Sequence, residues 1–158
     1  MAWRRVLEKP LARLRRDQDP AKLVAGGLKL GRGVVLGRAT YIDTSGLDLI
    51  SIGDETVISA DVMILSHDNA TKLHLDRSLQ AAVKIGRRVY IGAHSIVLPG
   101  VEIGDGAIVG AGSVVRRDVP AGKIALGNPA EIVGDVESYV ARHRGRRDGG
   151  HGRRRYVP

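Results

Sequence analysis

The chain has 158 residues, no Cys and a formal net charge of +8. Its length predicts one domain, and the missing thiols exclude a disulfide framework, a catalytic thiolate and a Cys-ligated metal. No apolar run approaches the roughly 18 residues of a membrane span, and residues 1–5 lack the apolar core of a signal peptide, so a cytoplasmic location is expected. Because the basic residues concentrate at the two ends and 23–140 is slightly acidic, no nucleic-acid binding is expected.

Residues 1–25 are expected to form a basic helical cap. Apolar side chains recur there at helical spacing, with most basic residues on the other side. The apolar positions are Trp3, Val6, Leu7, Leu11 and Leu14. A helix that covers the open end of a repeat stack accounts for this pattern. The alternative is an amphipathic helix on an anionic surface, which would make the protein peripheral to the inner membrane face.

Residues 26–134 repeat with a period of six. The aliphatic column of this repeat comprises Leu30, Leu36, Ile42, Ile52, Ile58, Ile64, Ile85, Ile91, Val97, Ile103, Val109 and Val115. Small or β-branched residues lie two positions before the last six of these. A period of six is typical of hexapeptide β-helices, in which three hexapeptides close a triangular coil and the coils stack as parallel strands. The sequence therefore predicts an all-β parallel β-helix of about four coils. The absence of Phe and the 21 Gly residues suit its narrow bore and tight corners.

The rhythm slips between Ile42 and Ile52 and breaks clearly between Ile64 and Ile85. A break in an otherwise strict solenoid marks a loop thrown outward, often on the functional face. This places an excursion loop at 67–82 with His67 at its base. A His that a rigid wall holds within reach of solvent suits a general base. Its ring could be oriented by a backbone carbonyl, since the adjacent Asp68 is too close in sequence to be assumed the orienter.

The C-terminal part is expected to close the stack. Residues 130–143 read as a last strand followed by a short helix, which we place at 135–145. Residues 146–158 have the composition of a disordered basic tail. This tail either stays solvated or contacts an acidic partner.

Two stretches of the repeat resemble a known family. They are IGAHSIVLPGVEIGD at 91–105 and VGAGSVVRRDVP at 109–120, followed by GNPA at 127–130. They are similar to the left-handed β-helix O-acetyltransferases, which include maltose and galactoside acetyltransferases and the acyltransferases of polysaccharide gene clusters. The resemblance covers about 25–140. It implies a left-handed coil, acetyl-CoA as co-substrate without a metal, and a homotrimer with each active site between two subunits.

The resemblance also implies roles for particular residues. His67 falls on the family's catalytic histidine, which would deprotonate a hydroxyl directly. Ala93 falls in the segment whose backbone contacts the thioester region, and Ala111 falls where the pantetheine arm runs. Arg116 and Arg117 fall near the adenine nucleotide, whose phosphates suit guanidinium groups. The alternative for this pair is a charged turn at the end of a coil.

The acceptor is less well defined by the sequence. Maltose-type enzymes carry an upstream Asn that holds the acceptor, and this chain has the stretch YIDTS at 41–45 there. Within it, Asp43 could hydrogen-bond a hydroxyl, and Asp68 is the second candidate substrate contact. The loop that begins at His67 is nearest to the polysaccharide-cluster branch, which favours a sugar or glycan hydroxyl.

Two other functions remain open at this stage. A γ-carbonic-anhydrase-like enzyme would need three His around a metal, with His67, His74 and His94 as the candidates. A non-catalytic β-helix could serve as a scaffold subunit, since fold does not dictate function.

Overall fold

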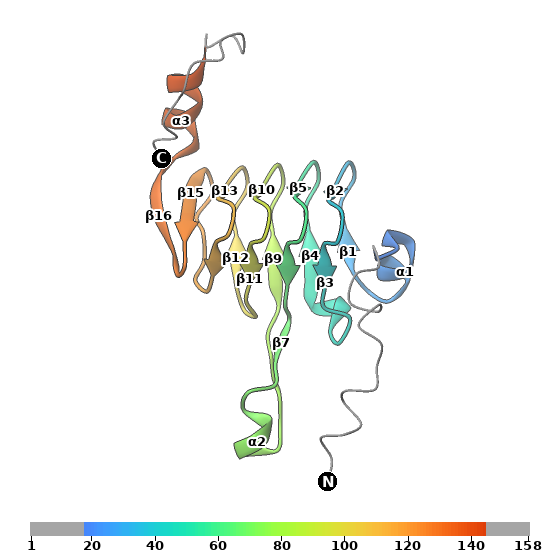
Figure 1. Ribbon diagram of the computed structural model, residues 1–158. Coiled ribbons are helices and arrows are strands. Elements are labelled where there is room, and N and C mark those ends of the chain that lie inside the picture. Colours follow the sequence, from blue (N-terminus) through green and yellow to red (C-terminus); the bar gives the residue numbers. More distant parts are fainter. Residues whose placement is uncertain (1–17, 145–158) are drawn as a thin grey trace.

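The computed structural model describes residues 18–144, which form a stack of short parallel strands wound into a three-walled coil (Figure 1). Wall A contains β1 (Lys29–Leu30), β4 (Ile50–Ile52), β9 (Val83–Ile85) and β12 (Glu102–Ile103). Wall B contains β2 (Val35–Leu36), β5 (Val57–Ile58), β10 (Tyr90–Ile91) and β13 (Ile108–Val109), continued by β15 (Lys123–Gly127) and β16 (Ala130–Asp135). Wall C contains β3 (Tyr41–Ile42), β6 (Met63–Ile64), β11 (Ile96–Val97) and β14 (Val114–Val115). Each coil gives one strand to each wall, so the predicted hexapeptide architecture of about four coils is confirmed.

The predicted aliphatic column runs through the core. From Ile42 to Val115 its members are at most 3% exposed. The column two positions upstream is buried as well, including its hydroxyl side chains. Ser95 Oγ donates to the Gly110 carbonyl at 3.0 Å, and Thr56 Oγ1 donates to the Gly86 carbonyl at 2.8 Å. These bonds satisfy the hydroxyl groups and so offset the cost of burying polar side chains in an apolar bore.

The Gly that follows several aliphatic positions is required by the stacking of the coils. A Cβ on Gly92 would lie 2.4 Å from the backbone nitrogen of Ala111, and one on Gly104 would lie 2.4 Å from that of Ala121. Real Cβ atoms do not approach backbone so closely. Gly106 serves a different purpose, because its φ of +67° is the left-handed conformation of a corner and nothing lies near its Cβ position.

The N-terminal end of the stack is covered by α1 (Pro20–Ala25). Asp19 caps this helix through its Oδ1, which accepts from the Ala21 N–H at 3.0 Å. Leu23 is buried and joins the core cluster. The helical cap expected at 1–25 is thus described only from residue 18, and its first 17 residues lie outside the described part.

At the other end, β15 and β16 form an antiparallel hairpin that turns through the cis peptide Asn128–Pro129. The helix α3 (Val136–His143) follows, has no buried residue and points away from the stack (Figure 1). The predicted tail at 146–158 lies outside the described residues. Within 18–144, no helix is long and apolar enough to cross a membrane.

Both breaks in the repeat are insertions at the corner where wall C gives way to wall A. The first contains the 3₁₀ helix η3 (Leu47–Leu49), between β3 and β4. The second is a projecting hairpin, 67–80, which we call the arm (Figure 1). It consists of β7 (His67–Asp68), α2 (Lys72–Leu75) and β8 (Leu79–Gln80), with β7 and β8 antiparallel. The excursion expected at 67–82 is therefore built as a hairpin with a helical tip.

Candidate active site

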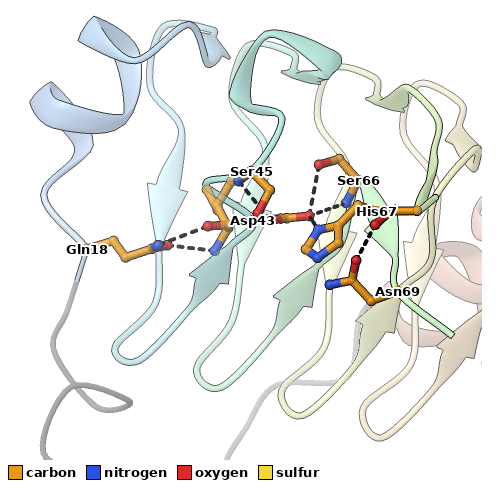
Figure 2. A network of polar contacts seen from close by, with 8 residues as sticks. Gln18, Asp43, Ser45, Ser66, His67 and Asn69 are labelled. Carbon is orange, nitrogen blue, oxygen red and sulfur yellow. Dashed lines mark hydrogen bonds and ion pairs between the residues drawn. The ribbon is translucent and has the colours of Figure 1, made fainter. Parts of the chain in front are cut away.

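The register of wall C brings the two insertions together. Ile42 pairs with Ile64, and the Asp43 N–H donates to the Ile64 carbonyl at 2.9 Å. The segments that follow β3 and β6 therefore leave the wall side by side. As a result, Asp43 lies next to Ser66 and His67 at one corner (Figure 2).

His67 is held by the carboxylate of Asp43. Its Nδ1 contacts Asp43 Oδ2, and because the ionised carboxylate can only accept, Nδ1 carries the hydrogen. The lone pair of the neutral ring is then on Nε2, which has no hydrogen-bond partner among residues 18–144. The His67 side chain is 21% exposed, whereas that of Asp43 is fully buried. This arrangement presents a basic nitrogen to solvent from a fixed ring.

Asp43 is kept charged by its surroundings. Oδ2 also accepts from the Ser66 N–H at 3.0 Å and the Ser66 hydroxyl at 2.9 Å, and Oδ1 accepts from the Ser45 N–H at 2.9 Å. Burial alone would raise the pKa of Asp43, but the hydrogen bonds from Ser45, His67 and Ser66 outweigh it and lower this pKa to about 2. Burial, followed by the charge of Asp43, raises the pKa of Tyr41, so this phenol stays neutral.

The expectation that Asp43 contacts the acceptor is wrong. Its side chain has no exposed surface and both oxygens are occupied by hydrogen bonds, so it orients His67 instead. The Asp43 carboxylate thus orients the ring, a role for which the sequence suggested a backbone carbonyl. Asp68 does not contact the ring, since its Oδ1 accepts from the Ala70 N–H at 2.7 Å in the turn that starts the arm. Its substrate contact stays a prediction.

Sequence reasoning missed three further members of this network. Ser45 and Ser66 anchor the carboxylate, and Gln18 hydrogen-bonds the backbone of Ile42 (Figure 2). The repeat could have predicted Ser45 and Ser66, because Ile42 and Ile64 occupy the same column in successive coils. The residues that follow Ile42 must therefore lie beside those that follow Ile64. Gln18 precedes the repeat and has no such signal.

The arm is joined to this network at its base. Asn69 Oδ1 accepts from the Ser78 hydroxyl, and Thr71 Oγ1 donates to the Arg77 carbonyl at 2.8 Å. The Ala81 N–H donates to the carbonyl of Ser66. The hydroxyl of the same Ser66 donates to the Asp43 carboxylate. The residue that follows the arm is thus tied to the residue that precedes it.

The four residues expected to bind the donor are not gathered around His67. Ala93 and Ala111 follow β10 and β13 of wall B, at the corner with wall C, and the Gly112 N–H donates to the Ala93 carbonyl at 2.8 Å. Arg116 and Arg117 follow β14, at the corner with wall A on which His67 also lies, two coils further along. Wall C therefore separates the two alanines from the base within one chain.

A groove of about 440 Å³ lies beside Ala111, between wall B and the C-terminal β16 and α3. Small residues form part of its wall, including Gly92 and Gly110, and Tyr139 and Arg142 line it from α3. The small side chains leave room for a narrow chain to lie against the backbone. Arg116 and Arg117 are exposed and form no ion pair within the described residues, so their guanidinium groups are available to an anion.

The histidines that a carbonic-anhydrase-like site would need are dispersed. His67 is at the base of the arm, His74 is in its helix α2, and His94 is at the opposite edge of wall C. No group of three metal-ligating side chains occurs among residues 18–144. The geometry gives this alternative no support.

Comparison with known proteins agrees with the fold. Residues 82–117 match the model of the bacterial transferase hexapeptide, six repeats. WbbJ of Escherichia coli strain K12, whose name proposes a lipopolysaccharide biosynthesis O-acetyl transferase, is 35% identical over 127 residues, which are 68% of this chain and 65% of WbbJ. YvoF of Bacillus subtilis strain 168, whose name proposes an acetyltransferase, is 39% identical over 106 residues, which are 67% of this chain and 59% of YvoF. The chain thus spans less than two thirds of either relative.

A solved structure supports the architecture alone. The N-acyltransferase AntD from Bacillus cereus, in complex with dTDP and 3-hydroxybutyryl-CoA, superposes with a TM-score of 0.61 at 22% identity, covering 75% of this chain and 78% of AntD. Its identity is too low to carry a function. Residues 82–117 thus match the bacterial transferase hexapeptide family, and the described residues 18–144 are wound in coils of the same six-residue repeat.

Proposed function

We propose that the protein is an O-acetyltransferase that moves an acetyl group from acetyl-CoA to a hydroxyl of a sugar or glycan, on a left-handed β-helix. The observation that carries the proposal is the Asp43–His67 pair, which fixes the ring at a partly exposed corner, with Nε2 unpartnered among residues 18–144. The name of the relative WbbJ supports a glycan acceptor.

The chemistry follows from this geometry. Nε2 of His67 takes the proton of the acceptor hydroxyl as its oxygen attacks the thioester carbonyl. The imidazolium that forms is balanced by the carboxylate of Asp43, which is already charged. Collapse of the tetrahedral intermediate breaks the C–S bond, and the departing thiolate of CoA takes the proton back from Nε2. The products are the acetyl ester and free CoA, and His67 returns to its neutral form.

Acetyl-CoA would lie in the groove beside Ala111. The backbone at Ala93 would face the thioester region, and an N–H there would stabilise the oxyanion. Arg116 and Arg117 would pair with the phosphates of the nucleotide. Because wall C separates the alanines from His67 in one chain, a complete site needs a second subunit.

We infer a homotrimer from this need for a second subunit and from the side chains that each wall exposes. Wall B exposes Val35 and Tyr90, and wall C exposes Tyr41 and Met63. Wall A instead carries charge, with Lys84 and Glu102 in an ion pair. Two apolar walls allow each subunit to contact two neighbours in a closed ring. A neighbour's His67 would then reach the groove beside Ala111. The cytoplasmic location, and contact of the N-terminal segment with the inner membrane face, stay predictions.

The test is a screen of sugar and glycan acceptors with acetyl-CoA, in which released CoA is measured as free thiol. We expect acceptor-dependent release, and His67→Ala should lower kcat by about 10²- to 10⁴-fold, the usual contribution of a general base. The Kd for acetyl-CoA should not change. His143→Ala, which removes an exposed histidine from the end of α3, is the matched control. Full turnover of His67→Ala would place the base elsewhere, and failure to bind acetyl-CoA would favour the scaffold alternative.

A further inference from the structure

Gln18 occupies the open edge of wall C. The strand order of this wall is β14-β11-β6-β3, so among residues 18–144 β3 pairs with one strand, β6. The N–H groups of Tyr41 and Asp43 donate to the carbonyls of Val62 and Ile64, at 2.8 and 2.9 Å. Ile42 lies between them, and its N–H and carbonyl therefore point to the unpaired side.

The side chain of Gln18 satisfies both groups. Its Nε2 donates to the Ile42 carbonyl at 2.9 Å, and its Oε1 accepts from the Ile42 N–H at 2.6 Å (Figure 2). A primary amide carries the same donor and acceptor as a peptide unit. Gln18 thus makes the two hydrogen bonds that a paired strand would make, at the residue directly before Asp43.

We propose that Gln18 is a positioning residue for the Asp43–His67 pair, an inference that rests on the proposed function of that pair. The backbone of Asp43 is held from inside the wall by Ile64 and, through Ile42, from outside by Gln18. The carboxylate on this backbone determines the orientation of the His67 ring. A shift of Ile42 moves the carboxylate relative to Nδ1, and a small displacement of a catalytic group has a large effect on rate.

This role is separate from capping the stack. The helix α1 has its own N-cap in Asp19 and its own core contact through Leu23. Within the described part of the chain, both hydrogen bonds of the Gln18 amide are made with Ile42. The neighbouring residue Asp19 therefore provides a control that weakens the same segment without touching β3.

The first experiment compares Gln18→Ala, Gln18→Glu and Asp19→Ala by steady-state kinetics. For both Gln18 variants we expect kcat to fall by about 10- to 100-fold with KM for acetyl-CoA unchanged. The carboxylate of Gln18→Glu keeps the shape but cannot donate to the Ile42 carbonyl, so it tests the proposal even where Gln18→Ala fails to fold. Asp19→Ala should keep its kcat. Equal losses in all three variants, or a change confined to KM, would overturn the proposal.

A double-mutant cycle then tests whether Gln18 acts through Asp43. In an Asp43→Asn background, Gln18→Ala should cause no further loss of kcat, because the hydrogen bond that it positions is already altered. Losses that multiply would show that Gln18 affects turnover by another route.

A measurement without turnover separates this proposal from the proposed function. The Nδ1–H proton of His67 should give an NMR signal that is absent in His67→Gln. We expect this signal in the wild type and in Asp19→Ala, and its loss or broadening in both Gln18 variants. If the wild type transfers no acetyl group, the proposed function fails while this readout still decides on Gln18. An unchanged signal in the Gln18 variants would contradict the positioning role.

Discussion

The two C-terminal coils and the two N-terminal coils of this molecule are built from the same repeat but carry different kinds of contact. From β9 to β14 the six-residue spacing is unbroken, and the coils are joined by backbone ladders and buried aliphatic side chains. The N-terminal coils contain both insertions and, with them, the buried network around Asp43 and His67. Regular repeats thus build the walls, whereas interruptions supply the side chains that can do chemistry.

The largest expected effect concerns the regular coils. Gly92→Ala would place a Cβ 2.4 Å from the Ala111 nitrogen, so the stacked backbones must separate, at a cost of about 3 kcal/mol or more in the free energy of unfolding. Gly106→Ala places its Cβ in open space at a φ of +67°, and should cost about 1 kcal/mol. Urea unfolding measures both. Similar costs would show that the close approach of the coils is not what fixes this glycine.

The next effect concerns the interrupted coils. Asp43→Asn keeps the size of the side chain but removes the charge that balances the imidazolium, so kcat should fall by about 10²- to 10⁴-fold. Asp48→Asn, an exposed carboxylate in the same insertion, should keep its turnover. A normal kcat for Asp43→Asn would mean that the ring is oriented without this carboxylate.

Asp43 should also make the free energy of unfolding depend on pH. Its pKa is lowered from 3.8 in the unfolded chain to about 2 in the folded protein, so its contribution is fully present above about pH 4. As the pH falls from 4 to 2, the unfolded chain binds this proton first, and about 2 kcal/mol of stability is lost. The difference in unfolding free energy between wild type and Asp43→Asn should therefore shrink over this range. A constant difference would contradict the lowered pKa.

The smallest effect is expected at the far end of wall C. Arg117→Ala should raise KM for acetyl-CoA by about 3- to 10-fold and change kcat less, because a partly exposed phosphate contact is worth about 1 kcal/mol. Arg32→Ala removes an exposed Arg at a different corner and is the charge-matched control. Titration of acetyl-CoA in steady-state assays separates the two constants. An equal effect of both variants would indicate a general attraction of the anion by net charge.

The sequence was sufficient to predict the coils, because each buried position repeats at a spacing that only a hexapeptide helix uses. It was also sufficient to place His67 at the base of an excursion. The role of Asp43 was misjudged because a slip in the rhythm hides which residues stack across coils. The pairing of Ile42 with Ile64, which settles the matter, is a property of register.

Other features depend on contacts that no local pattern encodes. Gln18 precedes the repeat, and its pairing with Ile42 is visible only once β3 is known to be an edge strand. The separation of Ala111 from His67 likewise follows from which wall each preceding strand joins. A resemblance transfers residue roles one by one and does not say which of them share a corner.

Both insertions leave the stack at the same corner, and this restricts where such a chain can change its length. An extra residue within a wall would shift every ladder after it, whereas the arm hangs from a single hairpin whose two strands return to neighbouring points. Arms of other lengths and compositions could therefore be grafted beside His67 while the remaining coils keep their pairing. The surface beside His67 is in this way open to change separately from the thermal stability of the scaffold.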